Sequence, residues 1–280
     1  MTKRITTLTL GGMKENKEKI TMATAYDYSS AKVADEAGIE MILVGDSLGM
    51  VVLGYENTLS VTLDEMIHHG KAVVRGVKRA MVVIDLPFMT YQITKEDALR
   101  SAGRAIQETG APAVKLEGGE DMAKTVEKIV RAGIPVVGHI GLTPQSVGQM
   151  GGFLVQGKNE RMARQLLKDA LALEDAGACA VVLEGIPWQL GQLITEKITI
   201  PTIGIGAGVY CDGQVLVYHD ILGLQTELSP KFVKQFGQFY HPMLEAMRAY
   251  AKEVKDASFP ALEHSFTMDE NIIEKLREKY

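Results

Sequence analysis

Short apolar stretches alternate with longer amphipathic stretches along most of this chain. Five of the apolar stretches end in an ionisable side chain: Met41–Asp46, Met81–Asp85, Ala113–Glu117, Ile134–His139 and Cys179–Glu184. A short β-branched run bounded by turn residues is typical of a buried parallel strand. Because helical patterns separate these runs, the sequence predicts a series of βα units.

The remaining segments complete a set of eight such units. Further strands are expected at Ile20–Thr24, Thr202–Ile205 and Val215–His219, and helices at about 30–36, 62–77, 94–110, 121–131, 160–176 and 188–196, with a long helix opening at Ser229-Pro230. Thr62 and Glu65 have the spacing of a capping box, and Thr94 and Gly110 fit the start and end of another helix. A stripe of Phe232, Phe236, Phe239 and Tyr240 is interpreted as core packing.

A (βα)₈ barrel of the TIM type takes about 250 residues, so a chain of 280 residues leaves room for one barrel and a tail. We therefore expect a single α/β barrel domain over residues 1–256. A C-terminal helical tail is expected over residues 257–280, where Thr267 and Glu270 fit a capping box for a short helix at Asp269–Glu278.

Composition and charge limit the kinds of partner expected for this protein. A hydrophobic content of 46% is sufficient for a large core, and the net charge of −5 argues against a nucleic-acid partner. The N-terminal residues lack the apolar centre of a signal peptide, and no apolar run is long enough to span a bilayer. We expect a cytoplasmic protein that does not act at a membrane.

The strand ends carry the candidate chemistry, because the C-terminal ends of barrel strands form the active-site mouth. Asp46, Asp85 and Glu117 are hard oxygen donors on successive strands. Two like charges 4 Å apart repel by about 4 kcal/mol at an effective dielectric of 20, so a shared divalent cation would relieve the cluster. An all-oxygen donor set favours Mg²⁺. The alternative for each single aspartate is a helix cap or a loop hydrogen bond.

Three further ionisable residues belong to the same rim. Lys115 lies two residues before Glu117 and therefore on the same face of its strand, which favours a buried functional amine over an outward lysine. Glu184 ends the sixth strand and suits an acid or base facing the metal. His139 lies between them in strand order, where it either orients a ligand or bonds a loop carbonyl. The glycine-rich segment 141–157 is a candidate lid.

These residues lie in motifs that resemble the ketopantoate hydroxymethyltransferase (3-methyl-2-oxobutanoate hydroxymethyltransferase) family. The matching segments are Thr24–Asp27, Val44–Met50, Val61–Thr62, Asp85–Phe88, Val114–Gly118, Gly138–Gln145, Leu183–Glu184, Gly204–Gly208 and Asp212–Val217. The resemblance covers about residues 20–222. It implies a barrel of the phosphoenolpyruvate/pyruvate type that transfers a one-carbon unit from 5,10-methylenetetrahydrofolate to 3-methyl-2-oxobutanoate, giving 2-dehydropantoate for pantothenate and coenzyme A synthesis.

The resemblance also implies roles for individual residues. Asp46, Asp85 and Glu117 would hold Mg²⁺ directly or through water, and Asp46, Ser47, Asp85 and Lys115 would bind the keto acid. Glu184 would accept the proton when the enolate forms. Family members are commonly homodecamers, so a homo-oligomer is expected.

Three other functions stay open at this point. A metal-dependent lyase or mutase of the same superfamily would bind a similar 2-oxo acid without folate. A Schiff-base aldolase would use Lys115 as its nucleophile, independently of metal. A catalytically inactive barrel would serve as a binding or scaffold protein and would be insensitive to Glu184→Gln.

Overall fold

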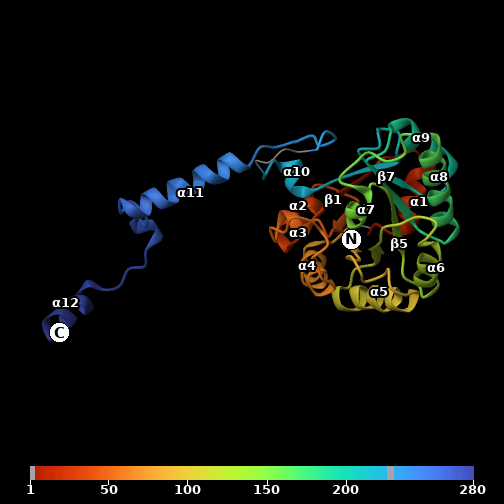
Figure 1. Ribbon diagram of the computed structural model, residues 1–280. Coiled ribbons are helices and arrows are strands. Elements are labelled where there is room, and N and C mark those ends of the chain that lie inside the picture. Colours follow the sequence, from red (N-terminus) through yellow and green to blue (C-terminus); the bar gives the residue numbers. More distant parts are fainter. Residues whose placement is uncertain (1–3, 226–229) are drawn as a thin grey trace. The chain divides into compact units, whose positions relative to one another are not determined.

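Eight parallel strands close into one barrel in chain order. The protein is described by a computed structural model that covers residues 4–225 and 230–280, with helices surrounding the strands (Figure 1). The strands are β1 Ile20–Thr24, β2 Met41–Val44, β3 Met81–Asp85, β4 Ala113–Lys115, β5 Val136–Gly141, β6 Ala180–Glu184, β7 Thr202–Ile205 and β8 Gly213–Leu216. β8 pairs with β1 and closes the ring. The barrel predicted from the sequence is confirmed.

Helices connect the strands much as their local signals predict. They are α1 Thr7–Glu15, α2 Tyr28–Glu36, α3 Leu48–Val51, α4 Leu63–Gly76, α5 Lys95–Thr109, α6 Ala123–Arg131, η1 Pro144–Ser146, α7 Val147–Met150, α8 Glu160–Asp175, α9 Trp188–Lys197 and α10 Tyr218–Leu222. Thr62 and Glu65 form the expected capping box of α4. Thr94 caps α5, and Gly110 ends it in the left-handed conformation. The short helices α1, α3, η1, α7 and α10 were not predicted from the sequence.

Alternate residues of each strand pack into two separate layers. Met41, Leu43, Met81, Val83 and other inward side chains fill the barrel interior. Their neighbours Ile42, Val44, Val82 and Ile84 face outward into the layer beneath the helices. This period of two follows from the pleat of a strand. The same alternation determines which residues at the C-terminal ends of the strands point into the mouth of the barrel.

The N-terminal end of the barrel is closed by α1. Its Leu10 is fully buried with the interior side chains. Lys14 Nζ donates to Asp212 Oδ2 at 2.8 Å and to the carbonyl oxygens of Thr195 and Ile200. These contacts join α1 to the chain segments that precede β7 and β8.

The eighth unit differs from its prediction. The strand is Gly213–Leu216 instead of Val215–His219, and α10 begins at Tyr218. Gly213 pairs with Ile20 of β1 at a distance that leaves no room for a Cβ, so the ladder begins there. It ends because the Tyr218 N–H donates to the Thr24 hydroxyl instead of continuing the sheet.

The helix predicted from Ser229-Pro230 was also wrong. Ser229 lies outside the described residues, and 230–239 contains no helix. Phe232 packs against Gly206, and the N–H groups of Phe239 and Tyr240 donate to the carbonyls of Leu222 and Gly223 instead of to helical partners. The predicted core stripe fails for the same reason, because its members no longer share a helical face. Phe236, Phe239 and Tyr240 are 69%, 48% and 38% exposed.

Contacts group the described residues into two compact units. The barrel unit contains the described residues up to Ile221 and 230–234, and a second unit contains 222–225 and 235–280. The second unit holds α11 Tyr240–Lys255, η2 Leu262–His264 and α12 Glu270–Lys279. Asp269 caps α12, in place of the predicted Thr267.

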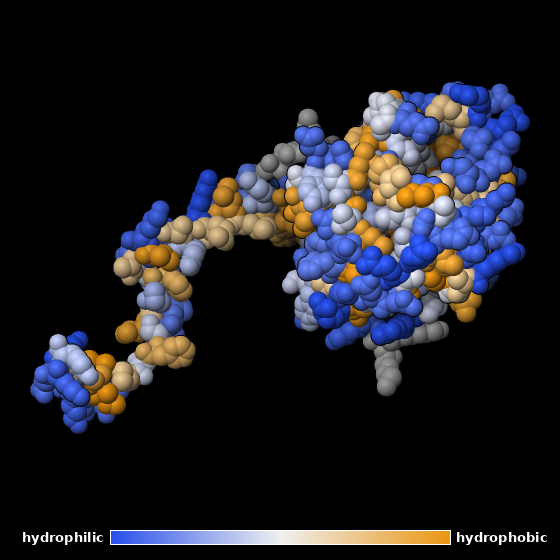
Figure 2. Space-filling model, turned by 60° about the horizontal axis from the view of Figure 1, so that its bottom comes forward, coloured by the Kyte–Doolittle hydropathy of each residue, from blue (hydrophilic) through white to orange (hydrophobic). Residues whose placement is uncertain are grey.

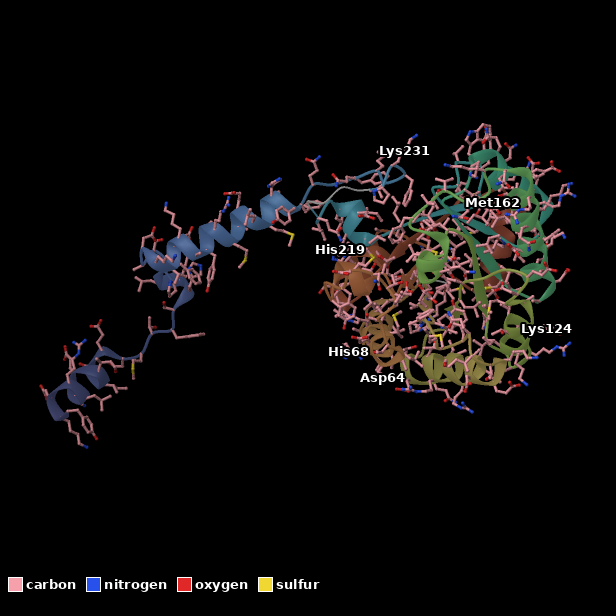
Figure 3. All side chains as sticks on the ribbon, in the orientation of Figure 1. Asp64, His68, Lys124, Met162, His219 and Lys231 are labelled. Carbon is pink, nitrogen blue, oxygen red and sulfur yellow. The ribbon has the colours of Figure 1, made fainter. Side chains whose placement is uncertain are left out.

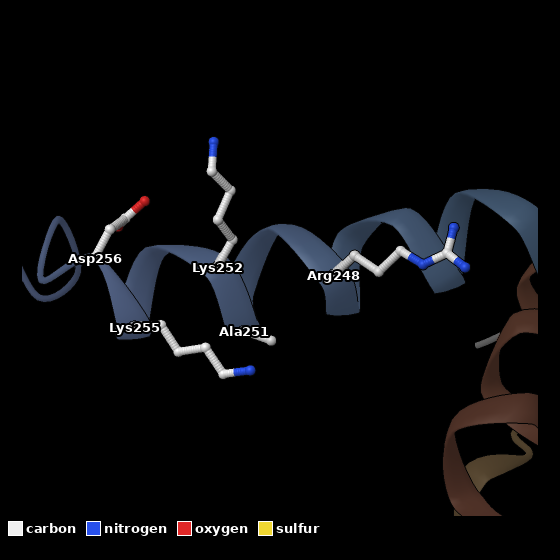
Figure 4. Close-up of a pocket in the computed structure, with 5 residues that line it drawn as sticks. All are labelled: Arg248, Ala251, Lys252, Lys255 and Asp256. Atoms are coloured by element: carbon white, nitrogen blue, oxygen red, sulfur yellow. The ribbon is translucent and has the colours of Figure 1, made fainter.

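Apolar side chains remain exposed along this second unit (Figure 2). On α11 they follow a helical stripe of Tyr240, Met243, Met247, Tyr250 and Val254. Arg248, Lys252 and Lys255 extend from the same helix (Figure 4). None of the helices within the described ranges combines the length and the apolar character that a membrane span requires.

Candidate active site

Charged side chains replace apolar ones at the C-terminal end of the inward face. Met81 and Val83 point inward on β3, and Asp85 continues that face; on β6, Ala180 and Val182 are followed by Glu184. The same alternation carries Lys115 and Glu117 on and after β4, and His139 on β5. Figure 3 draws all side chains of the described residues on the ribbon. The structure thus brings the predicted residues of four adjacent strands to one mouth.

Lys115 and Asp85 form a buried ion pair across neighbouring strands. The two residues are register partners on β4 and β3, and Lys115 Nζ lies 2.6 Å from Asp85 Oδ1. Burial opposes the charge on Lys115, but the surrounding carboxylates, Asp85 foremost, raise its pKa above the ordinary lysine value. The amine is therefore held as a cation.

Asp46 lies beside this pair, in the turn after β2. Its backbone N–H donates to Asp85 Oδ2 at 3.3 Å. Burial raises the pKa of Asp46 well above its ordinary value, and the neighbouring Asp85 and Glu117 carboxylates raise it further. Burial likewise raises the pKa of Asp85, although Lys115 counteracts it. Three carboxyl groups, those of Asp46, Asp85 and Glu117, are thus gathered around the Lys115 cation.

His139 stands between two carboxylates. Its Nδ1 is 3.4 Å from Glu117 Oε1, and its Nε2 is 3.2 Å from Glu184 Oε2. Both ring nitrogens therefore face a carboxylate oxygen at close range, although neither contact has ideal hydrogen-bond alignment. Burial and Lys115 oppose protonation, yet the two glutamates outweigh them and raise the pKa of His139 to about 9. Burial would raise the pKa of Glu117, but His139 and Lys115 lower it.

Glu184 and Ser47 are the site residues with access to solvent. The Glu184 side chain is 15% exposed, whereas those of Asp85 and Lys115 are 2% and 4% exposed. Ser47 Oγ lies 2.9 Å from the hydroxyl of the buried Tyr26. A molecule entering the mouth would therefore meet Glu184 and Ser47 above the buried charges.

The donor set fits a divalent cation with two protein ligands. Within the described ranges, no three His, Cys, Asp or Glu side chains are placed to share one metal ion. Asp46 and Asp85 are adjacent buried carboxylates with raised pKa values, and they suit Mg²⁺, which is commonly bound by one or two carboxylates plus water and substrate oxygens. Glu117 contacts Gln145 and His139 instead. Glu117 would therefore contribute to cation binding through a bridging water.

Sequence reasoning missed three residues that hold the site together. Gln145 bonds Asp46 and Glu117, Tyr91 bonds Gln145, and Tyr26 bonds Ser47. All three are buried. Gln145 and Tyr26 lie within motifs that carry the family resemblance, but neither is ionised or placed at a strand end, and the resemblance assigned them no role.

Solved structures with this fold include two enzymes that illustrate the likeness. Phosphonopyruvate hydrolase matches with a TM-score of 0.60 and 13% identity, covering 100% of this chain and 96% of that one. The 2,3-dimethylmalate lyase, a PEP mutase/isocitrate lyase superfamily member, matches with a TM-score of 0.56 and 17% identity, covering 97% and 98%. The chain is thus a (βα)₈ barrel of the architecture found in that superfamily, with an ionisable cluster at the catalytic end.

The sequence narrows this class to a family. The chain belongs to the ketopantoate hydroxymethyltransferase family, whose model matches residues 4–262. It is 59% identical over 273 residues to the 3-methyl-2-oxobutanoate hydroxymethyltransferase of Carboxydothermus hydrogenoformans, covering 98% of this chain and 99% of that protein. The resemblance noted from the motifs is confirmed, and the protein is a hydroxymethyltransferase enzyme.

Proposed function

We propose that the protein transfers a hydroxymethyl group from 5,10-methylenetetrahydrofolate to 3-methyl-2-oxobutanoate, giving 2-dehydropantoate for pantothenate synthesis. The observation that carries this proposal is the buried Lys115–Asp85 pair beside Asp46, with Glu184 at the open side of the same mouth. The arrangement offers positive charge for a keto acid and a carboxylate positioned to take a proton.

Lys115 supplies a fixed cation in this proposal. Its ammonium group would stabilise negative charge that develops on the keto oxygen. The 2.6 Å contact with Asp85 and the raised pKa keep the amine protonated, which disfavours the Schiff-base alternative, because a nucleophilic lysine must be neutral. Ser47, steadied by Tyr26, would donate to the carboxylate of the keto acid.

Glu184 is the proposed base. It would take the proton from the carbon next to the ketone, a role that typically contributes about 10²–10⁴-fold in rate. His139 contacts Glu184 at 3.2 Å and would orient this carboxylate. One water is consumed: it adds to the methylene carbon of the donor as the C–N bonds to folate break, and tetrahydrofolate leaves. The enolate carbon forms the new C–C bond to this carbon, and the oxygen supplied by the water takes a proton and becomes the hydroxyl group.

Mg²⁺ is the proposed cofactor, held by Asp46 and Asp85, with Glu117 acting through water. When bound, it would supply Lewis-acid polarisation of the ketone. The excess of buried carboxylates over cations supports this assignment.

Segment 141–157 is the proposed lid, which would limit the access of bulk water so that the enolate captures the one-carbon unit before it is lost to solvent. Both ends of the segment are tied to the chain beside Glu184, since Leu142 N–H donates to the Glu184 carbonyl and Gln156 N–H to that of Gly185. Phe153, Leu154 and Val155, between these two ties, are exposed. They would cover a bound substrate with apolar side chains.

The proposed reaction is tested with purified protein, Mg²⁺ and both substrates. We expect 2-dehydropantoate to form, and we expect deuterium from solvent to enter C3 of 3-methyl-2-oxobutanoate even without folate. Cleavage of a C–C or P–C bond without folate, and no 2-dehydropantoate with it, would instead identify a lyase or mutase. Absence of any turnover would favour a binding protein.

We also propose that the enzyme acts as a homo-oligomer in the cytoplasm. The exposed apolar stripe on α11 supports a contact with a second copy of the chain, because apolar faces of this kind commonly mark protein–protein interfaces. Light scattering of the full chain should give a multiple of 30.5 kDa. A double Met243→Asp, Met247→Asp variant should reduce that mass, whereas an unchanged mass would place the contact elsewhere.

A further inference from the structure

Gln145 occupies the centre of the hydrogen-bond network beneath the site. Its side chain is buried, and it follows β5 at the start of the glycine-rich segment. The side-chain Nε2 donates to Asp46 Oδ2 at 2.9 Å and to the Leu86 carbonyl at 3.0 Å. The backbone N–H donates to Glu117 Oε2 at 3.0 Å. One residue thus holds carboxylates that come from β2 and β4.

The orientation of the Gln145 amide is determined by its partners. Its Oε1 accepts from the Tyr91 hydroxyl at 2.7 Å and from Gln92 Nε2 at 3.2 Å. The Tyr91 oxygen already accepts the Glu117 N–H, so its own proton is available for Gln145. A flipped amide would set Oε1 against a carboxylate and a carbonyl, both of which only accept. Nε2 is therefore directed at Asp46.

We propose that Gln145 is a positioning residue for the cation site: its amide engages Asp46 Oδ2 and leaves Oδ1 as the oxygen that approaches a divalent cation. Tyr91 supports this role by holding the amide from the opposite side. The inference rests on the proposed function, because it assumes that Asp46 binds the cation. Because Gln145 lies near the start of segment 141–157, this end of the candidate lid would also help to set the geometry of the metal site.

The charges around Asp46 explain why a neutral amide suits it as a hydrogen-bond partner. Asp46 lies beside the carboxylates of Asp85 and Glu117, and its Oδ2 is held by the Gln145 amide at 2.9 Å. A buried amide donor fixes the carboxylate without adding a charge that would compete with the cation. Loss of such an outer partner typically weakens metal affinity by about 10–100-fold.

The test is Mn²⁺ binding to the full-length protein without substrates, measured from the electron paramagnetic resonance signal of free Mn²⁺. Gln145→Met keeps the length of the side chain and removes both the donor and the acceptor of its amide, and should raise the Kd for Mn²⁺ by about 10–100-fold. Tyr91→Phe should raise it by a smaller factor. The double variant should bind no more weakly than Gln145→Met alone, because Tyr91 acts through Gln145.

A matched control is available on the surface. Gln165 also donates to carboxylates, those of Asp169 and Glu120, but it is exposed on α8. Gln165→Met should leave the Kd for Mn²⁺ unchanged. Melting temperatures in EDTA, recorded for every variant, separate folding from binding: a purely structural role would lower the melting temperature and leave the Kd of the folded protein unaltered.

The outcomes are distinct. If the unsubstituted enzyme binds Mn²⁺ and Gln145→Met binds it within about twofold, the positioning role is overturned. If the Gln145→Met protein does not fold, Tyr91→Phe decides, and an unchanged Kd in that variant rejects the role. If the unsubstituted enzyme binds no divalent cation, the proposed metal site fails instead.

Discussion

The two ends of the barrel bury charge in different ways. At the N-terminal end, Lys14 faces one carboxylate, Asp212, and donates its other hydrogen bonds to two backbone carbonyls. At the C-terminal end, the Asp46, Asp85, Glu117 and Glu184 carboxylates share Lys115 and His139. The first arrangement is balanced within the chain, whereas the second has an excess of negative charge.

This difference assigns stability to the N-terminal end of the barrel and function to its C-terminal end. A balanced pair with satisfied hydrogen bonds joins α1 to the barrel and requires nothing more. An unbalanced cluster costs folding free energy, because buried like charges repel, and it persists where a ligand compensates for them. We therefore expect substitutions at the mouth to change binding and turnover, and substitutions at the N-terminal end of the barrel to change stability.

The largest effect should follow Glu184→Gln. The amide cannot take a proton, so kcat should fall by about 10²–10⁴-fold and C3 deuterium exchange should slow in parallel. Binding of Mn²⁺ and 3-methyl-2-oxobutanoate should persist. Glu196→Gln, in the exposed pair with Gln192 on α9, is the control and should be silent. Equal loss of keto-acid binding would argue against the role as base.

Asp85→Asn should come next. The neutral side chain removes one of two proposed ligands, so the Kd for Mn²⁺ should rise by about 100-fold. Asp64 provides the comparison, because its carboxylate contacts Arg104 at 2.7 Å on the surface. Asp64→Asn should bind Mn²⁺ normally. An Asp85→Asn enzyme with ordinary affinity would mean that Asp85 only pairs with Lys115.

Lys14→Met examines the opposite end. It removes the cation from Asp212, which still accepts from Thr202, and it removes a donor from two carbonyls. The free energy of unfolding should fall by about 1–3 kcal/mol. Urea denaturation would measure this loss. The kcat of the folded variant should stay unchanged, since Lys14 lies at the far end of the strands. A matching loss of turnover would contradict the separation of the two ends.

The smallest effect concerns pH. The pKa of His139, raised from 6.5 to about 9 by Glu117 and Glu184, means that the imidazolium stabilises the fold. This contribution is complete below pH 6.5 and is lost as the pH rises through 9. In EDTA, the free energy of unfolding should fall by about 1 kcal/mol or more between about pH 6 and pH 10. His139→Gln should show a shallower decline, and equal slopes would assign the effect to other groups.

Much of the barrel and its mouth could be predicted because the signals are local. The strand Met81–Asp85 and the helix caps at Thr62 and Thr94 depend on neighbouring residues, and the structure agrees with them. The shared face of Lys115 and Glu117 follows from the pleat of one strand. That Asp85 and Glu184 reach one mouth follows from the closure of the ring.

The errors lie where distant contacts override local pattern. The aromatic residues between 232 and 240 have helical spacing, yet Phe232 packs on Gly206 and the backbone bonds to Leu222 and Gly223. The start of β8 depends on how closely Gly213 approaches β1. Neither contact is visible in the spacing of apolar residues.

The amino-acid sequence by itself determined the order of the strands, the periodicity that turns their side chains inward and the ionisable residues at their ends, since each depends on residues a few positions apart. The tertiary structure alone decided how those charges are held: Lys115 against Asp85, His139 between two glutamates, and Gln145 against Asp46. The reason is that a buried polar group must find its partner in space, and the partner here comes from another strand or loop.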